Sequence, residues 1–161
     1  MPAAAPPVRL DRPAPPLALT DQHGQTVDIT GFRGRVVFVT FAFGHCETVC
    51  PLVVKNALAG ARAVAEPPVV LVVTVDPWRD TPSRLPDLAQ RWELERDGYA
   101  LSGEVETVGR VLDDWDVRRS RNMNDGSIVH GALTYVVDRD GRVAFATSGS
   151  EGALVEAVAA L

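Results

Sequence analysis

Two runs of apolar residues constrain the fold of this chain more than any other feature. Residues 36–43 and 69–75 are continuous stretches of β-branched and aromatic side chains. Such runs are typical of strands that are buried on both faces. Between them, apolar residues recur at helical spacing after Pro51. The order strand, helix, strand therefore predicts two parallel central strands joined by a right-handed crossover.

The remaining segments extend this order into an α/β domain of thioredoxin-like arrangement. The patterns predict an N-terminal β-hairpin at residues 17–29, helices at 81–92 and 104–115, and a short edge strand at 99–101. They also predict a second hairpin at 133–146 and a closing helix at 152–161. Residues 116–130 are polar and aperiodic, and we expect a long functional loop there. The predicted fold is a central mixed sheet flanked by helices.

Composition limits the domain count and the classes of partner. The chain has 161 residues, of which 46% are apolar, enough for one folded domain, which we place at residues 17–161. Residues 1–16 contain six prolines and are expected to form a flexible tail. The charge balance of 16 basic and 21 acidic residues, without a basic run, argues against a nucleic-acid partner. No apolar run reaches the length of a membrane span and no signal-peptide pattern appears, so the chain as given is expected to be soluble.

The two cysteines of the chain, Cys46 and Cys50, follow the first buried run and precede the predicted helix. This position is the carboxyl edge of an open α/β sheet, where ligands usually bind. Backbone N–H groups at a helix start favour the thiolate form. If the first helical turn includes Cys50, a spacing of four residues places both sulfurs on one helix face. Such a pair can close a disulfide or bind a soft metal such as Cu(I) or Zn(II).

A metal held by two thiolates needs a further ligand, and His130 is a candidate. The strand that begins near Gly131 is expected to run antiparallel to the strand that ends at Phe43, so His130 should arrive beside Cys46. Other interpretations remain open at this stage. His45 or Met123 could be the ligand instead, His130 could be an ordinary loop residue, and the cysteines could form a structural disulfide.

Three motifs, in order, resemble the Sco/SenC family. They are Cys46-x-x-x-Cys50-Pro51 after a Phe-rich strand, Thr74-Val-Asp-Pro-Trp-Arg-Asp-Thr-Pro82, and His130 before Tyr135-Val-Val-Asp-Arg-Asp-Gly141. The resemblance runs from about Leu17 to the C-terminus. It implies a thioredoxin-like fold and copper, as Cu(I) or Cu(II), bound by Cys46, Cys50 and His130.

The resemblance also implies a role and a location. Family members deliver copper, or reduce cysteines, during assembly of the dinuclear copper centre of cytochrome c oxidase. The implied partners are a copper acceptor such as cytochrome c oxidase subunit II, and other copper chaperones or thiol reductants. The implied location is extracytoplasmic, in the bacterial periplasm or on the outer face of the membrane, with a membrane-anchored precursor, and we expect a monomer.

The chain departs from the family pattern at several positions. Val129 stands where the family commonly has an aspartate before the histidine, which removes a possible acceptor for the imidazole. Between the cysteines the chain has Glu47, Thr48 and Val49, where many members begin with Pro-Asp. In the second motif we expect Asp76, Pro77, Arg79, Asp80 and Pro82 to shape the loop beside the site; a capped, proline-stiffened turn is the simpler interpretation.

The main alternative function is a thiol–disulfide oxidoreductase or redox sensor that uses Cys46 and Cys50 as a catalytic redox pair. Reductases of the thioredoxin type resemble one another in a proline just before the third strand, whereas this chain reads Val129-His-Gly-Ala-Leu-Thr134 there. The cysteine spacing is also one residue wider than usual in such enzymes. Whether the protein is an enzyme stays open on sequence grounds, and a metallochaperone is the preferred interpretation.

Overall fold

The computed structural model describes residues 5–45, 49–131 and 133–161. Its strands are β1 (Val8–Pro13), β2 (Ala18–Thr20), β3 (Thr26–Asp28), β4 (Val37–Ala42), β5 (Val69–Thr74), β6 (Gly98–Leu101), β7 (Arg119–Arg121), β8 (Ile128–His130), β9 (Thr134–Val137) and β10 (Arg142–Thr147). Its helices are α1 (Val49–Arg62), α2 (Leu85–Arg91), α3 (Val105–Asp114) and α4 (Glu151–Ala159), with 3₁₀ turns at Ile29–Phe32 and Pro82–Arg84.

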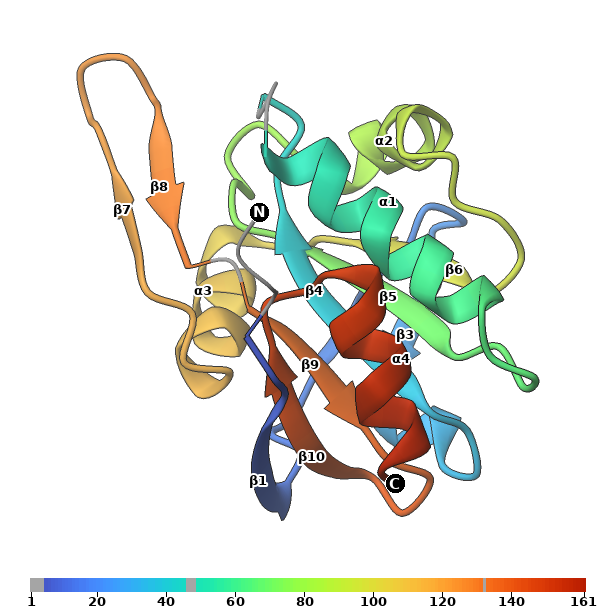
Figure 1. The fold of residues 1–161 in the computed structure, drawn as a ribbon. Coiled ribbons are helices and arrows are strands. Elements are labelled where there is room, and N and C mark those ends of the chain that lie inside the picture. The colour runs from blue at the N-terminus through green and yellow to red at the C-terminus, as the bar shows by residue number, and fades with distance from the viewer. Residues whose placement is uncertain (1–4, 46–48, 132) are drawn as a thin grey trace.

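A mixed sheet of six strands in the order β1-β10-β9-β4-β5-β6 forms the centre of the molecule (Figure 1). Strands β4, β5 and β6 are parallel, and β9 runs antiparallel to β4. Every residue of β4 and β5 is buried, as the two apolar runs predict. The predicted mixed sheet and its parallel central pair are confirmed.

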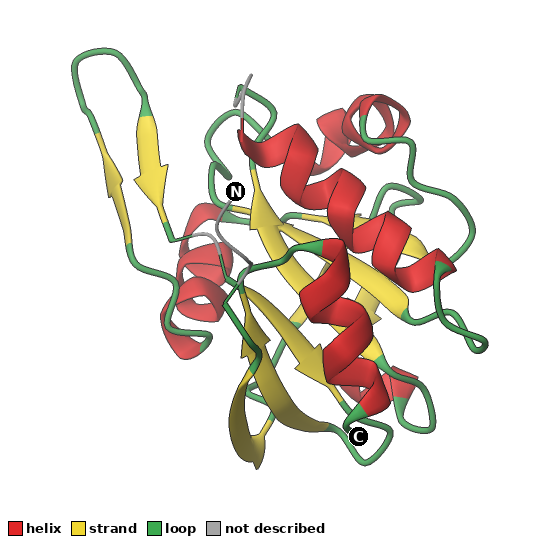
Figure 2. Ribbon diagram, in the orientation of Figure 1, coloured by secondary structure: helices red, strands yellow, loops and turns green. Residues whose placement is uncertain are grey.

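Helices cover both faces of this sheet (Figure 2). Two right-handed crossovers, β4–α1–β5 and β5–α2–β6, advance in the same direction and so place α1 and α2 on one face. Helix α4 packs beside α1 on that face, and α3 lies on the opposite one (Figure 1). The cysteine segment therefore lies in the connection between the end of β4 and the start of α1.

Both predicted hairpins are present. Strands β2 and β3 pair antiparallel, and β9 pairs with β10 around a turn in which the Asp138 N–H donates to the Arg142 carbonyl at 2.8 Å. The second hairpin matters for the site because the end of β4 and the start of β9 lie at the same edge of the sheet.

The outer edge of β6 is bonded by residues of the first hairpin. The Thr20 N–H donates to the Ser102 carbonyl at 2.9 Å, and the Ser102 N–H donates back at 3.0 Å. The Gln22 side-chain amide donates to the Gly98 carbonyl at 2.8 Å and accepts from the Ala100 N–H at 3.1 Å. Residues 17–29 thus complete the sheet beyond its last strand.

The N-terminal segment differs from the flexible tail that its prolines predict. Val8–Pro13 forms the edge strand β1, which pairs antiparallel with β10. A register shift between Arg9 and Arg12 surrounds Asp11, whose φ is 50°. The prolines lie outside the paired positions or at the strand end, so they do not prevent edge pairing.

Residues 116–130 also differ from the prediction of an irregular loop. They contain a hairpin in which Arg119, Ser120 and Arg121 pair with His130, Val129 and Ile128. The tip closes where the Gly126 N–H donates to the Asn122 carbonyl at 2.8 Å, with Gly126 at a φ of 74°. The Asn124-Asp125-Gly126 turn signal was present, but the flanking triplets are too short and polar to show strand periodicity.

Among the described residues, no helix combines the length and the apolar character that crossing a bilayer requires.

Candidate metal centre

The cysteine segment begins where β4 leaves the core. Cys50 lies in the first turn of α1, as the predicted pairing of the two sulfurs requires. Its side chain, and the whole of Cys46, lie outside the described residues. The ligand assignment of the two sulfurs therefore stays a prediction.

His130 is the last residue of β8, and its ring lies against Phe43, just beyond the end of β4. The two ring centroids are 5.7 Å apart with an interplanar angle of 74°. A residue distant in sequence thus reaches the strand end from which the cysteine segment departs. This is the proximity that antiparallel pairing of β4 and β9 predicts.

The His130 imidazole has the protonation pattern of a metal ligand. Its Nδ1 lies 2.7 Å from the Gly131 carbonyl oxygen, and because a carbonyl only accepts, Nδ1 holds the proton. In the neutral ring the lone pair then belongs to Nε2. Burial lowers the pKa of His130, although the bond to Gly131 acts in the opposite direction. The ring is therefore neutral near pH 7, the form that binds metals.

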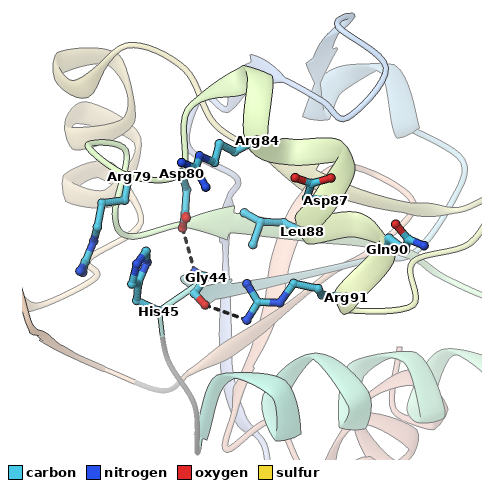
Figure 3. A pocket seen from close by; sticks show the side chains of 9 residues that line it. All are labelled: Gly44, His45, Arg79, Asp80, Arg84, Asp87, Leu88, Gln90 and Arg91. Carbon is cyan, nitrogen blue, oxygen red and sulfur yellow. Dashed lines mark hydrogen bonds between the residues drawn. The ribbon is translucent and has the colours of Figure 1, made fainter.

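The other soft or imidazole candidates lie in different surroundings. The Met123 side chain is 80% exposed near the hairpin tip, where its sulfur lies 3.7 Å from Arg121 Nη1. His45 is exposed and its ring lies among Arg79 and Asp80 in a hollow of about 350 Å³ (Figure 3). Arg84, Asp87 and Arg91 line the same hollow, so its charges are of both signs.

Asp80, from the second motif, holds the backbone at the entrance of the cysteine segment. Its Oδ2 accepts from the Gly44 N–H at 3.0 Å (Figure 3) and also from the Thr74 hydroxyl at 2.7 Å. Burial raises the pKa of this carboxyl, whereas these two hydrogen bonds lower it. Arg91 binds the carbonyl of the same glycine, because its Nη2 donates to the Gly44 carbonyl oxygen at 3.0 Å.

The backbone N–H and the backbone carbonyl of Gly44 are thus both hydrogen-bonded to side chains, two residues before Cys46. The sequence motif indicated that Asp80 shapes a loop, but it did not indicate Arg91. A contact between a side chain and a backbone carbonyl 47 residues away leaves no local pattern that could have revealed it.

Replacing Gly44 by alanine is expected to destabilise the fold by about 1–3 kcal/mol, the usual cost of overpacking. A Cβ at Gly44 would lie 2.7 Å from Leu88 Cδ2 and 2.9 Å from Asp80 Oδ1. Urea denaturation followed by circular dichroism measures the change. Gly31→Ala is the matched control, since nothing lies within 4 Å of its added Cβ. Equal stability of the two variants would contradict the crowding at Gly44.

Asp76 and Arg79 form a second polar cluster beside the site. Asp76 is fully buried at the end of β5, and Arg79 Nε donates to its Oδ2. Arg79 Nη2 also donates to the carbonyl of Gly126 in the β7–β8 turn at 2.6 Å. Beside it, Arg121 stacks over the Trp78 ring at 4.4 Å from the ring centroid. The second motif therefore contacts both the cysteine segment and the hairpin that carries His130.

These features define a class: a thioredoxin-like domain with an imidazole placed at the strand end that leads into a cysteine pair. The chain belongs to the SCO1/SenC family, whose model matches residues 10–161.

Relatives and solved structures agree with this assignment. The chain is 26% identical to an SCO2-like protein of Rickettsia prowazekii over 135 residues, which are 79% of this chain and 65% of that protein. It is 30% identical to the mitochondrial SCO2 homolog of Bos taurus over 133 residues, 77% of this chain and 49% of that protein. The chain thus spans between about half and two thirds of the length of these relatives.

Two solved structures show the same fold. Copper-bound ScoI of Bradyrhizobium japonicum matches with a TM-score of 0.72 and 27% identity, covering 92% of this chain and 99% of that one. Apo Sco1 of Thermus thermophilus matches with a TM-score of 0.79 and 25% identity, covering 98% of each chain. The predicted thioredoxin-like fold is confirmed.

Proposed function

We propose that this protein is a copper chaperone of the Sco type that binds one copper ion through Cys46, Cys50 and His130. The observation that carries the proposal is the place of His130, whose neutral ring lies against Phe43 at the entrance of the cysteine segment. Family membership and the copper in the Bradyrhizobium ScoI structure support the choice of metal.

The donor set suits copper in both oxidation states. Two thiolates and one neutral imidazole are soft and borderline ligands, which Cu(I) accepts in trigonal geometry. A similar sulfur and imidazole environment holds Cu(II), with an intense sulfur-to-metal band in the visible spectrum. Helix α1 begins at Val49, and free N–H groups at a helix start favour a nearby thiolate over the thiol.

Copper is the cargo in this proposal. The acceptor is a protein that receives copper during assembly of the dinuclear copper centre of cytochrome c oxidase, and subunit II is the expected partner. Acceptor thiolates would replace the ligands of this chain one at a time. Copper would thus pass by ligand exchange, and its oxidation state would not change. On the strength of family membership, we place the protein outside the cytoplasm and expect a membrane anchor in its precursor.

His130→Ala is expected to weaken Cu(II) binding by about 100-fold or more, beyond the 10–100-fold cost of losing a partner that only orients a ligand. The visible sulfur-to-copper band should shift or disappear, while disulfide formation between the cysteines stays intact. Competition titration with a chelator of known affinity measures the change.

His23→Ala and His45→Ala are the matched controls. His23 is exposed in the turn of the first hairpin, and its replacement should have no effect. If His45→Ala weakened copper binding and His130→Ala did not, the assignment of the third ligand would be wrong.

The oxidoreductase alternative is not favoured by the family and its copper-bound relatives. The same variants separate the two functions. A reductase would turn over disulfide substrates equally well with His130→Ala and would lose activity with either cysteine. Metal loading requires reduced sulfurs, so the oxidised protein should take up no copper until a reductant is added.

A further inference from the structure

The hairpin that carries His130 does not belong to the central sheet. Strands β7 and β8 form a sheet of their own with three paired positions (Figure 1). An isolated two-stranded hairpin of this size is at best marginally stable in water. The position of His130 therefore depends on the contacts that attach the hairpin to the rest of the molecule.

One set of contacts secures the base of the hairpin. Arg119 Nη1 donates to Asp113 Oδ1 of α3 at 2.9 Å and to the Val117 carbonyl at 3.1 Å. The Gly131 N–H donates to the Arg118 carbonyl at 2.9 Å. These bonds fix where the two strands leave the body, but not the angle at which the hairpin stands.

Arg79 makes the contact at the other end. Its guanidinium donates at the same time to the buried carboxylate of Asp76 and to the Gly126 carbonyl in the hairpin turn. Asp76 lies two residues beyond the end of the buried strand β5 and its side chain is fully buried, so this end of the link is rigid. Charge-assisted bonds of this kind are about twice as strong as neutral ones. A Cβ at Gly126 would lie 3.4 Å from Arg79 Nη1, which shows how closely the turn approaches.

The neighbouring pair adds to this link. Arg121 of β7 stacks on Trp78, which precedes Arg79 in the same loop. Such a cation–π contact attracts the guanidinium to the face of the indole ring. The side chains of Trp78 and Arg79 thus connect the hairpin to the loop that follows β5.

We propose that Arg79 is a positioning residue for His130: it holds the β7–β8 hairpin against the end of β5 and so keeps the imidazole at its contact with Phe43. Its meaning for copper rests on the proposed function. An imidazole on a fixed hairpin is present at the sulfur pair at a high effective concentration, and a hairpin free to swing lowers that concentration without removing a ligand.

The first test uses metal-free protein and so does not depend on copper. In Arg79→Lys, a positive charge stays near Asp76, but the planar fork that reaches both partners is lost. In the double variant Asp76→Asn/Arg79→Gln, the buried charge is removed together with its partner, which protects the fold. Both variants should raise amide hydrogen exchange in residues 119–130 by about tenfold or more while β4 and β5 stay protected. Nuclear Overhauser effects between the Phe43 and His130 rings should weaken in parallel.

Arg84→Lys and Arg84→Gln are the matched controls. Arg84 is exposed in the neighbouring 3₁₀ turn and makes no salt bridge within the described part of the chain. Unchanged exchange and an unchanged Phe43–His130 contact in the Arg79 variants would overturn the proposal.

The second test adds copper. The Arg79 variants should bind Cu(II) about tenfold or more weakly, whereas Cu(I), which two thiolates hold well, should change less. If the Arg79 variants showed faster exchange in the hairpin but unchanged Cu(II) affinity, the positioning role would be overturned. If the wild-type chain took up no copper at all, the proposed function would fail, and the exchange and ring-contact measurements would still decide whether Arg79 holds the hairpin.

Discussion

Cys46→Ser and Cys50→Ser are each expected to abolish stable copper binding. A serine hydroxyl is neutral near pH 7 and is a poor ligand for soft metals, so each variant keeps one thiolate and one imidazole. We expect a loss of affinity well beyond the roughly 10–100-fold that outer partners contribute, and a loss of the visible sulfur-to-copper band. Titration of reduced protein with copper, followed by absorption spectroscopy and metal analysis, measures both.

The two single variants control for each other, because the chain has only these two cysteines. Each should retain one titratable thiol and a wild-type circular dichroism spectrum. A variant that bound copper with wild-type affinity and spectrum would show that its cysteine is not a ligand.

Trp115→Ala is expected to cause the largest loss of stability, about 3–5 kcal/mol of unfolding free energy. The Trp115 side chain is fully buried, and its ring lies 5.6 Å from that of Tyr135, centroid to centroid. The Tyr135 hydroxyl donates to the Trp115 carbonyl at 2.9 Å, so the end of α3 is joined here to strand β9. Small domains have only about 5–15 kcal/mol of stability in total, so this variant should be close to unfolding.

Trp78→Ala is the matched control for the tryptophan. The Trp78 side chain is 46% exposed and its ring contacts Arg121. We expect a change below about 1 kcal/mol, since surface substitutions seldom cost more. Urea denaturation curves of both variants measure the difference, and similar losses would contradict the assignment of Trp115 to the core.

The central part of the fold could be predicted because burial on both faces leaves a clear mark on a sequence. Strands β4 and β5 are continuous apolar runs, and α1 between them shows helical periodicity. The same topology predicts that His130 approaches the end of β4, since strand direction alone decides which ends share an edge. That part of the site needed no knowledge of individual contacts.

The edge strand β1 and the β7–β8 hairpin could not be predicted by the same reasoning. Val8 pairs with Ala146, and no local pattern reports a partner at such a separation. The side chains of β1 are mostly exposed and those of the hairpin are half-buried or exposed, so alternation of apolar and polar residues is weak.

The contacts that support the candidate site were likewise hidden. Arg91 reaches the Gly44 carbonyl and Arg79 reaches the Gly126 carbonyl, each across 47 residues. A backbone carbonyl is present at every position, so its partner is not encoded by the residue that supplies it. The family motif indicated that Arg79 and Asp80 matter, and their hydrogen bonds to Gly126 and Gly44 give the reason.

The bonding of β6 to the first hairpin also bears on how the molecule behaves at high concentration. An open strand edge is a template on which another chain can add, and such additions lead to aggregation. Here the Gln22 side-chain amide is hydrogen-bonded to the Gly98 carbonyl and the Ala100 N–H, and the Thr20 backbone is hydrogen-bonded to Ser102. The Gln22 side chain thus makes hydrogen bonds that a neighbouring strand would otherwise make. The outer edge of β6 is therefore a poor site for a second molecule to add a strand.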